Sequence, residues 1–217
     1  RRAALDPFAM AAAAPEDAKP LAEPLPMDAD IRTAFEAALT YHKDFPKEGI
    51  TFVDFFPVFR DAALVKKIVA EHATAIAMRG AVTGVTVTHI AGLDSRGFML
   101  GPMIAAEMNL PFVPVRKAGK LPGKTIMAEY KLEYGSAKIE VQEDAVPKGA
   151  TFAVVDDLLA TGGTMTAAVG LLMKAGAKVD ATYVAIELAG LGAASKVGAP
   201  VFAVSSVTDE DLSARVA

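Results

Sequence analysis

The chain has 217 residues, a formal net charge of −4 and no cysteine, and 53% of its residues are hydrophobic. This length allows one well-buried domain, and the lack of cysteine excludes disulfides and thiolate metal sites and fits a reducing compartment. The basic residues are scattered and the apolar windows are short and interrupted, so neither nucleic-acid binding nor a membrane span is expected.

Residues 1–27 are rich in Ala and Pro and have no periodic apolar face, which predicts a flexible tail before a single domain over residues 28–217. Because Arg1 stands at the first position, we expect the leading residues to derive from cloning, with Met10 as the natural start. The start lacks the apolar core of a secretory signal, and we expect a cytoplasmic protein.

Residues 44–57 form an irregular segment with prolines, a glycine and several phenylalanines. Aromatic side chains on such a loop either stack on a flat ligand or pin the loop to the core, and the residues alone leave both readings open. Helices are predicted on either side of this segment, over residues 28–39 and 60–79, because both repeat apolar positions at helical spacing.

A strand is predicted over residues 85–93, followed by a polar turn, residues 94–97, that opens a helix. Asp94 or Ser95 alone is typical of a helix cap. Arg96 places a guanidinium beside the free N–H groups of the helix start, which is a favourable seat for a phosphate.

Residues 111–115 form another short strand, and the loop that follows, residues 116–124, carries four cations among glycines and a proline. By composition this loop is either a solvated connector or a mobile lid over an anion. Residues 125–135 and 137–142 are strand-like and extend the same segment.

The chain is organised around residues 152–164. The apolar run Phe152–Val155 predicts a strand buried on both faces, and Asp156 and Asp157 follow it directly. Because successive strand residues face opposite ways, both acids serve one ligand only if the backbone curls after Asp156. The small residues 160–164 then open a helix and form a cradle that suits a phosphate, unless the acids merely cap and the glycines merely turn.

Further strands are predicted over residues 179–188 and 200–204, with helical turns between them. The alternation of helices and apolar strands indicates an α/β fold with a central, mostly parallel sheet flanked by helices. His42, His72 and His89 lie far apart in the sequence and lack metal-ligand spacing, so no histidine metal site is expected.

Residues 154–164, Val-Val-Asp-Asp-Leu-Leu-Ala-Thr-Gly-Gly-Thr, closely resemble the phosphoribosyl pyrophosphate (PRPP) motif of the type I phosphoribosyltransferases. Residues 45–54, Phe-Pro-x-x-Gly-Ile-x-Phe-x-Asp, are similar to the base-binding hood of the members that act on adenine. The resemblance covers most of residues 44–190. It implies the type I fold, with an N-terminal hood at about 44–60 and a flexible lid loop at about 116–142.

The resemblance also implies a role for each motif. Asp156 and Asp157 would hold the ribose hydroxyls, while Glu133 would manage the purine proton and Tyr134 would help to close the lid. The 5′-phosphate of PRPP or AMP would bind Ala160, Thr161, Gly162, Gly163 and Thr164. Pyrophosphate would bind Asp94, Ser95, Arg96, Arg116, Lys117 and Lys120, with a cis peptide between Asp94 and Ser95. Adenine would stack on Phe52 and meet the backbone of Thr51 and Val53, where relatives often carry Arg in place of Val53.

The implied reaction is one of purine salvage, in which adenine and PRPP give AMP and pyrophosphate, with Mg²⁺ held mainly through PRPP, pyrophosphate and water. Members of the family are homodimers, so a homodimer is expected, without nucleic-acid or membrane partners. Two alternatives stay open. One is transfer to guanine, hypoxanthine or orotate, against which the hood motif argues. The other is a non-catalytic PRPP sensor that controls transcription, for which the tail is too short to hold a DNA-binding domain.

Overall fold

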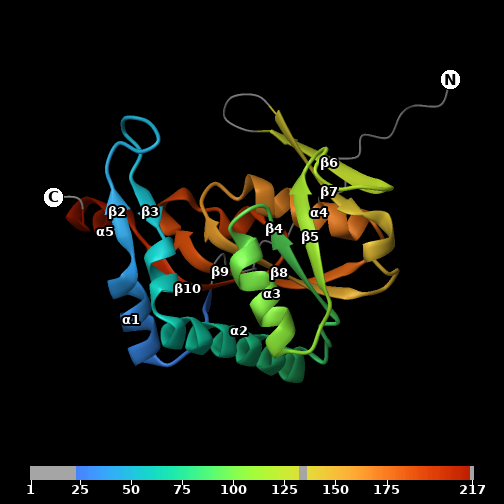
Figure 1. Cartoon of the computed structure of the whole chain (residues 1–217), viewed down its shortest axis with the longest axis horizontal. Coiled ribbons are helices and arrows are strands. Elements are labelled where there is room, and N and C mark those ends of the chain that lie inside the picture. Colours follow the sequence, from blue (N-terminus) through green and yellow to red (C-terminus); the bar gives the residue numbers. More distant parts are fainter. Residues whose placement is uncertain (1–22, 132–135, 216–217) are drawn as a thin grey trace.

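The computed structural model describes residues 23–131 and 136–215, and a single twisted sheet forms their centre (Figure 1). The sheet is eight-stranded, in the order β1-β10-β9-β8-β4-β5-β7-β6. The first six strands in this order, β1, β10, β9, β8, β4 and β5, run parallel to one another. Strands β7 and β6 extend the sheet beyond β5 and pair antiparallel. The strands are β1 Glu23–Pro24, β4 His89–Leu93, β5 Phe112–Lys117, β6 Thr125–Lys131, β7 Ser136–Gln142, β8 Thr151–Leu159, β9 Lys178–Leu188 and β10 Val201–Val207.

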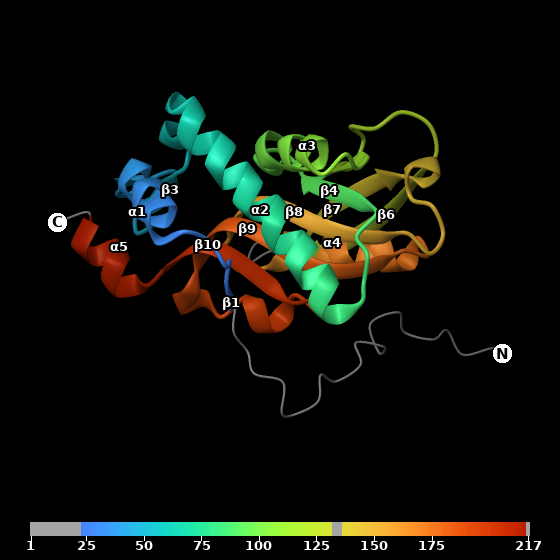
Figure 2. The same cartoon turned by 90° about the horizontal axis from the view of Figure 1, so that it is seen from below.

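Helices cover both faces of the sheet, as the alternating pattern predicts (Figure 2). Helices α1 (Ala29–Ala38), α2 (Ala62–Thr83) and α3 (Gly97–Glu107) bury side chains in one core, whereas α4 (Gly163–Lys174) lies on the other face. A short helix, α5 (Asp209–Arg215), follows β10. No helix within the two described ranges is long and apolar enough to cross a bilayer.

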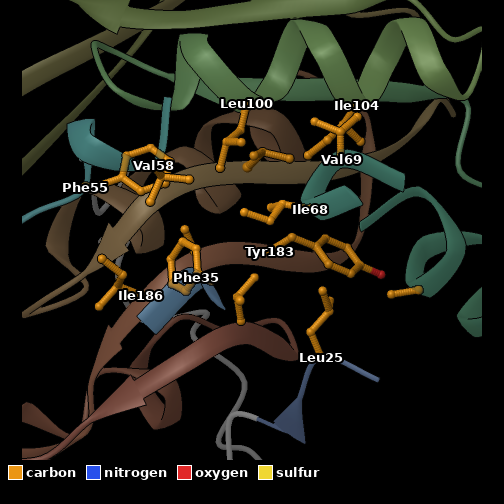
Figure 3. Close-up of a cluster of buried hydrophobic side chains, with 14 of the residues drawn as sticks. Leu25, Phe35, Phe55, Val58, Ile68, Val69, Leu100, Ile104, Tyr183 and Ile186 are labelled. Atoms are coloured by element: carbon orange, nitrogen blue, oxygen red, sulfur yellow. The ribbon is translucent and has the colours of Figure 1, made fainter. Parts of the chain in front are cut away.

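The central strand β8 divides its side chains between the two cores. Ala153 and Val155 contribute to the core under α2 and α3, and Phe152 and Val154 contribute to the core under α4. This alternation is the period of two that an extended strand imposes. Figure 3 shows the first core, in which the fully buried Tyr183 packs among aliphatic side chains.

Two predicted strand boundaries differ from the structure. The strand expected to end at Val155 runs on to Leu159, because β9 continues beside it and Leu158 pairs with Ile186. The strand expected from residue 85 begins only at His89, since α2 extends to Thr83. The first correction matters for the site, because Asp156 and Asp157 lie within β8 rather than beyond it.

The end of the predicted tail belongs to the folded body. Residues 1–22 lie outside the described residues, but β1 pairs with β10 and Leu25 is fully buried. Arg32 of α1 fixes this segment by donating to the carbonyl oxygens of Leu25 and Val204. A strand of two residues has no periodicity, which is why the sequence pattern did not separate it from the tail.

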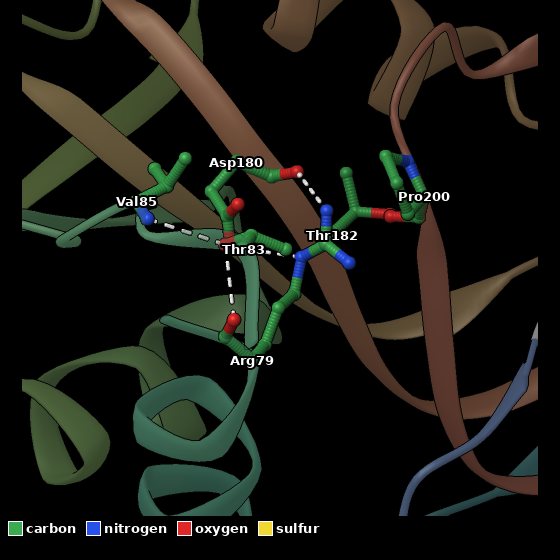
Figure 4. Close-up of polar contacts among 6 residues, drawn as sticks. All are labelled: Arg79, Thr83, Val85, Asp180, Thr182 and Pro200. Atoms are coloured by element: carbon green, nitrogen blue, oxygen red, sulfur yellow. Dashed lines mark hydrogen bonds and ion pairs between the residues drawn. The ribbon is translucent and has the colours of Figure 1, made fainter. Parts of the chain in front are cut away.

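The end of the sheet opposite the acidic pair is held by an ion pair between α2 and β9 (Figure 4). Arg79 Nε lies 3.0 Å from Oδ2 of Asp180, whose side chain is almost fully buried. Thr182 donates from its hydroxyl to the Pro200 carbonyl and so ties β9 to the start of β10. These contacts lie at the end of the sheet away from the carboxyl ends of its parallel strands, where open α/β sheets bind ligands.

Candidate active site

Strands β4 and β8 are neighbours, so the two motifs that follow their apolar residues meet at one edge of the sheet. Gly97, the first residue of α3, lies directly against β8. A Cβ atom at Gly97 would stand 2.7 Å from the Val155 carbonyl oxygen and 3.1 Å from Asp156 Oδ1. Only glycine allows this approach. The peptide between Asp94 and Ser95 is cis, which confirms the expectation from the resemblance.

Arg96 joins three of the predicted subsites. Its Nε atom lies 2.9 Å from Oδ2 of Asp157, which is only 3% exposed. Its guanidinium carbon lies 5.5 Å from the centre of the Phe52 ring. The residues expected to hold ribose, pyrophosphate and adenine are therefore adjacent, although they come from β8, the start of α3 and the hood.

The two acids are close enough to influence each other's pKa. Burial raises the pKa of Asp156 well above its ordinary value, and the neighbouring Asp157 carboxylate raises it further. Burial also raises the pKa of Asp157, while the Arg96 guanidinium opposes this shift. The site thus places two buried carboxylates beside one arginine, which contacts Asp157, and hydroxyl donors from a bound molecule would stabilise these carboxylates.

The backbone does not curl after Asp156, although the alternation of strand residues made such a curl the condition for both acids to serve one ligand. Pairing with β9 continues through Leu158 and Leu159, and the Asp157 N–H donates to Asp156 Oδ1 at 2.9 Å. Both acids nevertheless reach the turn that opens α3, Asp157 through Arg96 and Asp156 beside Gly97. The condition is unnecessary, because the turn that opens α3 lies against both acids of the extended strand.

The small-residue loop after β8 has the geometry that an anion site requires. Gly162 adopts a φ of 82° as the residue before α4, and no side chain caps the helix start. The free N–H groups of α4 are therefore open to an anion. The predicted phosphate residues lie together here, with Ala160, Thr161 and Gly162 in the loop and Gly163 and Thr164 in the first turn.

Arg116 is the penultimate residue of β5, at the start of the predicted basic loop, and its side chain reaches the turn before α3. Its Nε atom lies 3.1 Å from Asp94 Oδ2, and its Nη1 atom donates to the Lys120 carbonyl at 3.2 Å. The structure thus brings Arg116 and Asp94 together, while Lys117 and Lys120 are exposed on the same loop. Ser95 is also exposed.

Glu140 of β7 is a site-forming residue that the sequence analysis missed. Its Oε1 atom accepts the N–H groups of Lys120 and Leu121, each at 2.8 Å, and the residue is 3% exposed. The carboxylate therefore anchors the basic loop to the β6–β7 hairpin, which rises on the same side of the sheet as the hood (Figure 1). An acid between Ile139 and Val141 gave no signal of this role.

The hood is a hairpin of β2 (Thr40–His42) and β3 (Phe52–Asp54). Phe52 is half-buried and meets Phe45 edge to face, with ring centres 5.2 Å apart. Phe55 is 1% exposed, whereas Phe45 is 53% exposed. Phe55 therefore pins the segment to the core, whereas the stacking of Phe52 on a flat ligand stays a prediction. Thr51 and Val53 flank Phe52 as predicted, with Val53 buried.

The predicted proton-handling residue Glu133 and the predicted lid residue Tyr134 lie in segment 132–135, outside the described residues. The flanking strands β6 and β7 pair from Lys131 and Ser136 onward. Those two roles stay predictions.

The fold, and the adjacency of the residues expected to hold ribose, phosphate and base, are those of a phosphoribosyltransferase. A family model described as a phosphoribosyl transferase domain matches residues 61–210. Adenine phosphoribosyltransferase of Caenorhabditis elegans is 46% identical over 176 residues, which cover 80% of this chain and 91% of that protein. Adenine phosphoribosyltransferase 1 of Saccharomyces cerevisiae is 42% identical, over 81% of this chain and 92% of its own length. The chain belongs to the adenine phosphoribosyltransferases, which are pentosyltransferases of purine salvage.

Solved structures of adenine phosphoribosyltransferases are similar in fold to this chain. Saccharomyces cerevisiae adenine phosphoribosyltransferase, complexed with an imino-altritol bisphosphate and adenine, has a TM-score of 0.76 at 40% identity, covering 82% of this chain and all (100%) of that one. The Trypanosoma brucei enzyme, in complex with AMP, pyrophosphate and ribose 5-phosphate, has a TM-score of 0.72 at 28% identity, covering 84% and 81%. The type I fold expected from the sequence is confirmed.

Proposed function

We propose that this chain transfers the 5-phosphoribosyl group of PRPP to adenine and releases AMP and pyrophosphate. The observation that carries this proposal is the position of Arg96, which contacts both Asp157 and the face of Phe52. A base stacked on Phe52 would therefore lie beside a ribose held at the acids, as attack on the anomeric carbon requires. Family membership supports adenine as the base.

The sugar phosphate is held by two neighbouring elements. The 5′-phosphate lies in the loop from Ala160 to Thr164, where the first N–H groups of α4 and the Thr164 hydroxyl act as donors. The ribose hydroxyls donate to Asp156 and Asp157, which satisfies the buried carboxylates described above. These contacts fix the ribose while its bond to pyrophosphate breaks.

Pyrophosphate carries the charge that develops as the bond breaks, so its stabilisation accelerates the reaction. Arg96 and Arg116 supply guanidinium groups, Lys117 and Lys120 supply ammonium groups, and Asp94 orients Arg116 through their 3.1 Å contact. Ser95 lies in the same turn. On binding, Arg96 moves its guanidinium from Asp157 to the leaving group, which frees that acid for the ribose.

Adenine stacks on Phe52 and its edge meets the backbone of Thr51 and Val53 in β3. Glu133 manages the proton that adenine loses as its nitrogen bonds to the sugar, and Tyr134 closes the lid over the site. Loop 116–142 excludes water, because a cation-like sugar would otherwise be hydrolysed.

Mg²⁺ is the proposed cofactor. Within residues 23–131 and 136–215, no three His, Cys, Asp or Glu side chains gather so as to hold a metal ion. Two acids of the candidate site, Asp94 and Asp157, are each paired with an arginine. This donor set fits an ion bound mainly by pyrophosphate oxygens and water. When bound, Mg²⁺ would supply positive charge to the leaving group.

The experiment that tests this function measures pyrophosphate release from PRPP and Mg²⁺ with adenine, hypoxanthine, guanine and orotate offered separately. Turnover with adenine alone is expected. Turnover with another base would contradict the assignment of Phe52, and PRPP binding without turnover would favour a sensor.

A homodimer in the cytoplasm is proposed from family resemblance. Light scattering of the purified chain tests whether its mass is that of a dimer.

A further inference from the structure

A tyrosine on the β6–β7 hairpin contacts the phosphate cradle. The Thr164 hydroxyl, in the first turn of α4, donates to the hydroxyl of Tyr130 at 3.1 Å. Tyr130 is half-buried, and its ring packs against the core under α4 together with Ile126 and Ala128 of the same strand. The contact therefore joins residue 164 of the cradle to a strand that comes from elsewhere in the sequence.

A second hydrogen bond holds strand β6 against α4. Lys174, the last residue of α4, donates from Nζ to the Met127 carbonyl at 3.4 Å. The Tyr130 hydroxyl is thus fixed by the packing of its ring and strand, and its position does not depend on Thr164 alone. A group fixed in this way can orient its hydrogen-bond partner.

Two hydroxyls in contact can reverse the direction of their hydrogen bond. Each has one proton and two acceptor lone pairs, and the proton rotates to suit its surroundings. In the structure, the Thr164 hydroxyl donates to the Tyr130 hydroxyl. An anion in the cradle is a stronger acceptor, so Thr164 would donate to it and accept the Tyr130 proton in turn.

We propose that Tyr130 is a positioning residue for the 5′-phosphate, whose hydroxyl orients that of Thr164 toward the bound phosphate monoester. This inference rests on the proposed function, because it assigns the cradle to a sugar phosphate. Tyr130 acts through Thr164 and touches no reacting atom.

The first test is the affinity of Tyr130→Phe for ribose 5-phosphate, measured by calorimetry with the full chain. Loss of one hydrogen bond should weaken binding about 2- to 10-fold. Thr164→Val should weaken binding at least as much, and the double variant should match Thr164→Val alone, because Tyr130 acts only through that hydroxyl. Thr164→Ser keeps the hydroxyl, so adding Tyr130→Phe to Thr164→Ser should still weaken ribose 5-phosphate binding.

Tyr183→Phe is the matched control, because the Tyr183 hydroxyl is buried without a hydrogen-bond partner among the described residues. It should leave ribose 5-phosphate binding unchanged. Unchanged binding in Tyr130→Phe, or additive effects of Tyr130→Phe and Thr164→Val, would overturn the inference and leave Tyr130 a packing residue. The readout needs no turnover, so a chain that fails to use adenine but shows this coupling would contradict the proposed function and not the role of Tyr130.

Discussion

Replacing Glu140 by Gln should weaken the binding of PRPP, although Glu140 has no proposed contact with PRPP itself. Glu140 Oε1 accepts the backbone N–H groups of Lys120 and Leu121, each at 2.8 Å. Burial raises the pKa of Glu140, but the backbone N–H groups around it outweigh burial and hold the pKa below its ordinary value. The carboxylate is therefore charged when it anchors the basic loop.

The magnitude follows from the charge on the acceptor. A net hydrogen bond to a charged group contributes about 1.5–3 kcal/mol, against about 0.5–1.5 kcal/mol for a neutral pair. Gln keeps a carbonyl acceptor but loses the charge, so we expect Glu140→Gln to lose about 1–2 kcal/mol of loop anchoring. If PRPP binding requires the anchored loop, its KM should rise about 5- to 30-fold, since each 1.4 kcal/mol is tenfold.

The assay is the KM for PRPP at saturating adenine, together with the hydrogen exchange of the Lys120 and Leu121 amides. The exposed Glu143, just beyond β7, provides the control Glu143→Gln, which should change neither quantity. Because the folded pKa of Glu140 is lowered, its stabilisation is complete above the ordinary Glu pKa and is lost as pH falls through the folded value. Faster amide exchange with an unchanged KM would refute the link between loop anchoring and PRPP.

Three further predictions follow from the site. Asp156→Asn should raise the ligand-free melting temperature at pH 7 by a few degrees and weaken PRPP binding. Because the pKa of Asp156 is raised in the folded state, the stability of the protein falls as pH rises from the unfolded-state pKa to the folded-state pKa. The variant should flatten this dependence of the melting temperature on pH. Phe52→Ala should raise the KM for adenine about tenfold, as loss of one base–aromatic contact does, and more than Phe45→Ala; equal effects would contradict the stacking role. Gly97→Ala should lower the free energy of unfolding in urea by about 1–3 kcal/mol, because its Cβ would meet backbone at 2.7 Å, whereas Gly170→Ala, with nothing within 4 Å, should not destabilise.

The parts of the site that the sequence predicted are those encoded locally. Residues 94–97 and 156–164 combine a strand, a turn of small or charged residues and a helix start, and each signal lies within a few positions of the next. The structure confirms that both segments meet at one edge of the sheet. The end of β8 was mispredicted because its last residues are strand only through pairing with β9, where the partner of Leu158 is Ile186, 28 positions further along the sequence.

Contacts across the sheet edge could not be predicted for the same reason. Glu140 and Tyr130 acquire their roles from the register in which β7 joins β5 and β6, and nothing near either residue in the sequence specifies that register. The hood hairpin shows the same limit, since β2 and β3 have three residues each and give no periodic signal. The aromatic motif predicted the position of Phe52, but not the strand that carries it.

The sequence also predicted the charged residues of the candidate site, but not the ion pairs that these residues form with one another. Arg96 pairs with Asp157 and Arg116 pairs with Asp94, so both arginines expected to hold pyrophosphate contact acids of the same site. Breaking a buried pair without replacement is strongly unfavourable, so a ligand must supply new partners to both members. PRPP has the required chemistry, because its ribose hydroxyls can donate to the acid while its pyrophosphate oxygens accept from the arginine. A fragment with only one of these groups would leave one charge unpaired. The affinity of the site for PRPP should therefore exceed what ribose 5-phosphate and pyrophosphate achieve separately.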